Sequence, residues 1–203
     1  MHSSKWHILG NAVFDHGRWQ LNGENAWKTI ESIPGFYKQI LTTSGVKINK
    51  PEKFFRIGEQ CAVVVAIALL VLKNSDLSDI EDFDQTAVLG YGDEGSHNGN
   101  LIYWNDYADN GHLAAQGHLF VGTLASTPLT QLALVLGSHA PVYYVSAASE
   151  KSSLASEIDF LEDQCQTLFL IESKVDYCRC LFLKSDPAGI SSEKIISFLQ
   201  EEK

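Results

Sequence analysis

The sequence predicts one α/β domain in which a layered sheet packs between helices. Short apolar strands alternate along the chain with segments of helical spacing, and this order is typical of layered α/β folds. The 203 residues are 45% hydrophobic and 20% charged. This length and composition suit one well-packed core and are short for two. We therefore expect residues 1–203 to form a single domain.

Apolar runs of strand length occur at five places, each bounded by polar or turn-forming residues. They are Trp6 to Phe14, Gln85 to Gly90, Pro141 to Ala147, Thr167 to Glu172 and Tyr177 to Leu183. Runs of this length that contain many β-branched and aromatic residues are typical of buried strands.

Helices are predicted between these strands. The five segments are Asn25 to Ile33, Phe54 to Lys73, Thr127 to Leu136, Ser149 to Cys165 and Ser191 to Glu202. We expect Pro34 and Gly35 to close the first segment and Gly137 to end the third as a C-cap. From Cys61 onward the second segment is apolar on all sides, so it must be covered on several sides in a layered fold.

A long stretch from Tyr91 to Gly117 is rich in Gly, Asn, Asp and His and is predicted as a functional loop. It contains or adjoins three histidines and four acidic residues that together offer metal ligands: His97, His112, His118, Asp93, Glu94, Asp106 and Asp109. Because no helical ligand motif supports a metal site, we interpret them as solvated loop residues. The sequence predicts neither a metal nor a cofactor.

Charge and cysteine content limit the function further. The net charge is −10 and argues against nucleic-acid binding and against an anionic membrane surface. The longest apolar run, Cys61 to Leu72, is shorter than the roughly 20 residues that a bilayer span needs. No secretory signal is visible at the start, and the four cysteines form no zinc motif. We expect reduced thiols in a cytoplasmic protein.

Several segments resemble, in order and spacing, the N-terminal part of a β-ketoacyl synthase. Lys5 to Ile30 (KWHILGNAVFDHGRWQLNGENAWKTI) resembles its opening strand, glycine, loop and Trp-containing helix, and Phe55-Arg56 resembles the start of its Arg-led helix. Val88 to Gly95 (VLGYGDEG) and His118 to Val145 (HLFVGTLASTPLTQLALVLGSHAPVYYV) resemble later segments. The chain is most similar to divergent β-ketoacyl synthase-like N-terminal domains, some of which act in aryl-polyene-type pigment pathways. The resemblance implies a thiolase-like layered αβα domain that corresponds to the N-terminal half of a ketosynthase.

The same resemblance implies that the condensing chemistry is missing. In that family the nucleophile is a cysteine on a sharp turn between a strand and a buried helix. Counted forward from Pro141, its position falls on Ser149, and no cysteine lies between Cys61 and Cys165. The other catalytic groups of the family come from the second half of the synthase, which this chain does not match. Ser149 is interpreted as a helix N-cap, because its side-chain oxygen can accept a hydrogen bond from a free backbone N–H. A nucleophilic serine would need a base beside it.

The sequence therefore predicts a non-catalytic β-ketoacyl synthase-like protein. It would act as a partner or chain-length-type subunit in polyketide or fatty-acid-like pigment biosynthesis. Two alternatives stay open: a serine-dependent acyltransferase or hydrolase that uses Ser149, and a stand-alone domain that binds a small ligand at Tyr91 to Gly117.

An interface is predicted at Val142 to Val145 (VYYV), which matches the edge strand that pairs across the dimer in the thiolase fold. Its uncharged β-branched and aromatic residues suit a covered edge better than an exposed one. We expect a homodimer, or a heterodimer with a synthase-like subunit. An acyl carrier protein is a possible further partner. Since carrier proteins are acidic, its docking would need a basic cluster such as Lys47, Lys50, Lys53 and Arg56.

Overall fold

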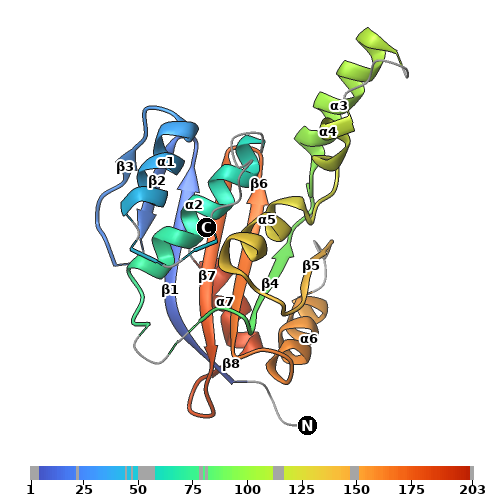
Figure 1. The fold of residues 1–203 in the computed structure, drawn as a ribbon. Helices are drawn as coiled ribbons and strands as arrows, with labels where there is room; N and C mark the ends of the chain where they lie inside the picture. Colours follow the sequence, from blue (N-terminus) through green and yellow to red (C-terminus); the bar gives the residue numbers. More distant parts are fainter. Residues whose placement is uncertain are drawn as a thin grey trace.

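The computed structural model describes residues 5–21, 23–43, 45–46, 48–49, 58–77, 80, 82–111, 117–146 and 151–201. These residues form one eight-stranded sheet with helices on both faces, as Figure 1 shows. The layered α/β architecture predicted from the sequence is therefore confirmed.

The strands follow the order β3-β2-β1-β7-β6-β4-β5 across the sheet, and β8 pairs with β1. Their bounds are β1 (Lys5–Asp15), β2 (Arg18–Leu21), β3 (Lys28–Thr29), β4 (Thr86–Tyr91), β5 (Val142–Val145), β6 (Thr167–Lys174), β7 (Tyr177–Ser185) and β8 (Ile190–Ser191). The β4 strand is parallel to β5 and to β6, whereas β7 is antiparallel to both β6 and β1. All five predicted strands are present, and β5 lies at one edge.

One face of the sheet is covered by α1 (Ile33–Thr43), α2 (Glu59–Lys73) and α5 (Thr127–Leu136). The α2 helix packs on the sheet and contacts both α1 and α5, and every residue from Val63 to Leu72 is buried. It is the covered central helix that its apolar sequence predicts. No helix in the described part of the chain is long and apolar enough to cross a membrane.

The other face of the sheet is covered by α6 (Lys151–Glu162) and α7 (Ser192–Glu201), which contact each other. Both helices bury their predicted inward residues, such as Ile158 and Ile195. Arg179, on β7, is buried against this layer, and its Nη1 donates a hydrogen bond of 2.7 Å to the carbonyl of Leu199. A cation at a helix C-terminus satisfies an unpaired carbonyl and suits the helix dipole.

The predicted helix from Asn25 to Ile33 is wrong. That segment contains β3 instead, and α1 begins at Ile33, where the sequence analysis expected a helix to close. Pro34 lies in the first turn of α1, where its missing N–H has no partner to lose. The side-chain oxygen of Ser32 accepts a hydrogen bond of 3.2 Å from the N–H of Gly35 and so stabilises this start.

The predicted loop from Tyr91 to Gly117 is also wrong. It contains α3 (His97–Asn110), and α4 (Gly117–Val121) begins at its end. These two helices, with the turn at 122–126, are here called the arm, which projects away from the sheet in Figure 1. No described side chain of α3 is buried, so α3 lacks the apolar periodicity by which a core-facing helix is recognised.

Candidate functional site

The turn predicted to hold the nucleophile position follows β5. The strand ends at Val145 and α6 begins at Lys151, so a strand precedes and a helix follows the predicted position. Ser149 lies outside the described residues, and its role stays a prediction. The basic residues considered for carrier docking, Lys47, Lys50, Lys53 and Arg56, also lie outside the described residues.

The four cysteines are all buried, and none of them offers a ready nucleophile. Cys61 is near the N-terminus of α2, where a helix dipole favours a thiolate. Burial nevertheless raises the pKa of Cys61 to about 12 and that of Cys165 to about 11. Burial also raises the pKa of Cys178 and of Cys180. At neutral pH these four thiols are protonated.

Within the described ranges, no three His, Cys, Asp or Glu side chains lie close enough to hold a metal ion. Of the candidate metal ligands named from the sequence, His112 and the side chain of His118 lie outside the described part of the structure. His97, Asp93, Glu94 and Asp109 are exposed, and Asp106 is half-buried.

The β5 strand pairs with β4 on one side, and no described strand pairs with its outer edge. All four of its residues are half-buried. Val142 and Tyr144 pack against the core beneath α2 and α5, whereas Tyr143 and Val145 pack against the core beneath α6. The Tyr143 hydroxyl donates a hydrogen bond of 2.8 Å to Glu157 of α6. The strand is thus firmly held on one side, and no described strand satisfies the backbone groups of its outer edge.

The arm is attached to this edge strand through Tyr144. The Tyr144 hydroxyl accepts a hydrogen bond of 3.2 Å from the N–H of Gly95, just before α3. The carbonyl of Gly95 in turn accepts a bond of 3.3 Å from Gln60, in the first turn of α2. The base of the arm, the edge strand and the central helix are therefore joined, and the arm begins beside the edge strand.

Inside the arm, α3 and α4 pack on each other. Tyr103 lies at the centre of an aromatic cluster, with ring centroids 5.6 Å from Phe120 and 6.0 Å from Trp104. Gly99 lies directly against the backbone of Gly122, so close that a Cβ at Gly99 would stand 2.0 Å from the Gly122 oxygen. This close approach requires glycine at position 99.

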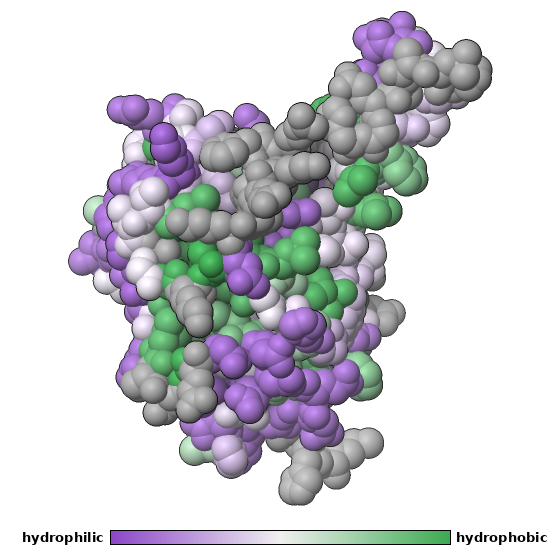
Figure 2. All heavy atoms as spheres, viewed as in Figure 1, coloured by the Kyte–Doolittle hydropathy of each residue, from purple (hydrophilic) through white to green (hydrophobic). Residues whose placement is uncertain are grey.

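The arm exposes many apolar side chains among its polar ones. Seven of its large hydrophobic side chains are exposed: Leu101, Ile102, Trp104, Tyr107, Phe120, Val121 and Leu124. Trp104 is 59% exposed, although tryptophan is normally largely covered. Figure 2 shows apolar side chains gathered over the base of the arm and over α5. Exposed apolar side chains gathered in this number are typical of an interface. The sequence analysis missed this surface because it assigned the segment to a loop.

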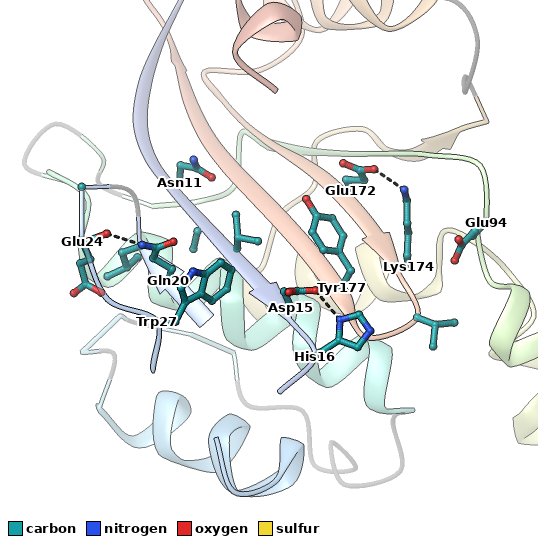
Figure 3. A pocket seen from close by; sticks show the side chains of 15 residues that line it. Asn11, Asp15, His16, Gln20, Glu24, Trp27, Glu94, Glu172, Lys174 and Tyr177 are labelled. Atoms are coloured by element: carbon teal, nitrogen blue, oxygen red, sulfur yellow. Dashed lines mark hydrogen bonds and ion pairs between the residues drawn. The ribbon is translucent and has the colours of Figure 1, made fainter. Parts of the chain in front are cut away.

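A separate cavity of about 810 Å³ lies over β1, β6 and β7, near the β1–β2 turn (Figure 3). Glu172 is 4% exposed, and its carboxylate pairs with the ammonium group of Lys174 at 3.0 Å. Asp15, which lies beside Tyr177 in the sheet, bonds to His16 and to Arg18. Within the stretch from Tyr91 to Gly117, Glu94 lines this cavity. The small-ligand site that the sequence suggested in that stretch stays a prediction.

This cavity has the chemistry of a polar binding site. Trp27 and Tyr177 are its aromatic residues, and its described lining includes no Ser, Thr or Cys side chain. Burial, helped by the Glu172 carboxylate, raises the pKa of Tyr177 to about 12, so its phenol stays protonated at neutral pH. The described lining of the cavity offers hydrogen bonds and ion pairs.

Comparison of the sequence with family models gives no match, and comparison with curated proteins gives none either. The structure matches solved ones. A chain from the complex of the ketosynthase ApeO with its chain length factor ApeC, from Xenorhabdus doucetiae, is 11% identical with a TM-score of 0.57. The match covers 91% of this chain and 80% of that one, so the two are of comparable length.

Two further matches are longer chains. The ishigamide ketosynthase/chain length factor is 10% identical with a TM-score of 0.58, and the match covers 92% of this chain and 64% of that one. A type II polyketide synthase complex, AntDE:AntF, in which an acyl-carrier protein is bound to its ketosynthase, is 11% identical with a TM-score of 0.56. That match covers 91% of this chain and 59% of the other. The present chain therefore spans less than two thirds of these two matched chains. Its fold is the ketosynthase-like, thiolase-type fold that the sequence predicted.

Proposed function

We propose that this protein is a non-catalytic subunit that binds a ketosynthase-like partner, as a chain length factor does, in polyketide or fatty-acid-like pigment biosynthesis in the cytoplasm. The observation that supports this most is the surface where β5, whose outer edge pairs with no described strand, adjoins the exposed apolar side chains of the arm. A protein with no partner would expose this surface to water, where an uncharged edge strand invites aggregation.

The matched structures support the same function. Two of them are described as containing a ketosynthase with its chain length factor, and a third contains a ketosynthase with its carrier protein. The first shows that a chain of comparable length to this one occurs in such a complex. An acyl carrier protein is therefore a possible third component.

We propose that the chain has no condensing activity because it lacks an accessible cysteine thiolate. A condensing enzyme needs a cysteine thiolate, and the four thiols here are buried with raised pKa values. We expect the purified chain to form no product from acyl and malonyl thioesters above a no-enzyme control. Product that disappears in Ser149→Ala would favour the serine-dependent enzyme instead.

The interface is tested by a substitution at the edge strand. Tyr144→Lys would place an ammonium group between β5 and the arm, where a partner has to exclude water. We expect a complex with a ketosynthase-like subunit of the same host to be lost in this variant, measured by co-purification and light scattering. Trp27→Lys is the matched control, because Trp27 is also partly exposed but adjoins β3 at the opposite edge of the sheet.

Circular dichroism on both variants checks that they fold. Loss of the complex in Tyr144→Lys, with Trp27→Lys still bound, supports the proposed interface. A complex that survives Tyr144→Lys, or a chain that binds none of the ketosynthase-like subunits of its host, contradicts it.

A further inference from the structure

The charge of this protein is concentrated in one segment, which contains the whole of the exposed surface described above. Residues 74–150 include ten of the 25 Asp and Glu residues and none of the 15 Lys and Arg residues. The rest of the chain is balanced. The formal net charge of −10 therefore belongs to residues 74–150 alone.

The structure places acidic residues of this segment around the proposed interface. Asp93 and Glu94 are exposed at the base of the arm, directly before Gly95, and Asp109 is exposed in the last turn of α3. Burial, with a smaller contribution from Asp93, raises the pKa of the Tyr144 phenol. The Asp93 carboxylate thus acts on the side chain that joins the edge strand to the arm.

A second copy of this chain is a poor occupant for such a surface. Symmetric pairing brings the same patch of both copies together, so residues 74–150 would face residues 74–150. Neither copy has a Lys or Arg in that segment to meet the acidic groups of the other. Lys174, whose charge also reaches Tyr144, is already paired with Glu172 at 3.0 Å. Facing like charges weaken a complex and slow its formation.

We propose that the surface formed by β5 and the arm excludes a second copy of this chain and binds a different, synthase-like chain. This partner would have an apolar centre to receive the exposed side chains of the arm and Lys or Arg residues around it to meet Asp93, Glu94 and Asp109. The inference rests on the proposed function and decides between the homodimer and the heterodimer that the sequence left open.

The first measurement uses the full chain alone. Sedimentation over a dilution series at low salt should give a monomer mass at every concentration. Salt screens repulsion between exposed charges, so any weak self-association should appear at high salt and not at low salt. A stable dimer at low salt that Tyr144→Lys dissociates would show that a second copy is the occupant, and would overturn the inference.

The second measurement uses full-length ketosynthase-like subunits of the host, purified one at a time, as probes. Asp93→Lys/Asp109→Lys reverses two exposed charges at the interface. Asp163→Lys/Glu193→Lys is the matched control, because it reverses two exposed charges outside residues 74–150 and changes the net charge equally. We expect the interface variant to bind the partner about tenfold more weakly at low salt, with a smaller difference at high salt.

The outcomes separate this inference from the proposed function. If the interface variant binds as tightly as the control while Tyr144→Lys abolishes the complex, the charge inference is wrong and the proposed function stands. If no ketosynthase-like subunit binds the unmodified chain, both are wrong. A loss of affinity confined to Asp93→Lys/Asp109→Lys supports both.

Discussion

Two helices of nearly equal length show how differently this chain uses its apolar residues. The α2 helix has 15 residues, and every residue from Val63 to Leu72 is buried. The α3 helix has 14 residues, and none of its described side chains is buried. The side chains of α2 are covered by the sheet, α1 and α5. Among the described residues, the side chains of α3 pack mainly on α4, and this difference supports the proposal that a partner covers the arm.

The comparison predicts its largest effect in α2. Leu69 is fully buried, so Leu69→Ala removes apolar contacts and leaves a cavity. We expect the free energy of unfolding of the isolated chain to fall by about 2–5 kcal/mol, measured by denaturant titration. A loss below about 1 kcal/mol would mean that α2 is not tightly packed.

An intermediate effect is expected at Gly99 in α3. The Cβ of Gly99→Ala would overlap the Gly122 backbone, and overpacking of this kind costs about 1–3 kcal/mol. Because α3 packs mainly on α4, we expect this cost to fall on the arm and to spare the core. Amide exchange should accelerate in α3 and α4 and stay unchanged in α2. Acceleration throughout the domain would show that the arm and the core unfold together.

The smallest effect is expected at Leu101, which is 49% exposed in α3. The same leucine-to-alanine change that destabilises α2 should alter the stability of the isolated chain by less than about 0.5 kcal/mol. In the complex with a ketosynthase-like partner, Leu101→Ala should instead weaken binding. A large loss of stability in the isolated chain would mean that α3 is already covered.

The same contrast explains which parts of the fold the sequence predicted. The five predicted strands and α2 could be recognised because their apolar residues face the core of this chain. The α3 helix could not be recognised in this way, since Leu101 and Trp104 face no described core residue and are spaced among Asn and Asp. Apolar periodicity in the sequence indicates which residues are buried in the core of the same chain. It does not indicate which residues are buried against a partner.

The β1–β2 hairpin was missed for a different reason. Its two-residue turn, His16-Gly17, has φ values of 47° and 76°, as the tight hairpin turns that favour glycine require. A His-Gly pair between two apolar runs was the available signal, although it is weaker than Asn-Gly. The cavity gave no signal at all, because its lining comes from residues that are distant in the sequence, such as Trp27, Glu94 and Glu172.

The packing of α3 on α4 also has an evolutionary consequence. Substitutions on the outer surface of the arm leave the core contacts of the sheet unchanged, so they need no compensating change elsewhere in the domain. A gene copy can therefore acquire a new binding preference through the arm alone while it keeps the same scaffold. The subunits of two duplicated complexes in one cell can in this way stop binding to one another. This requires that Gly99 and Gly122 still allow the two helices to pack closely.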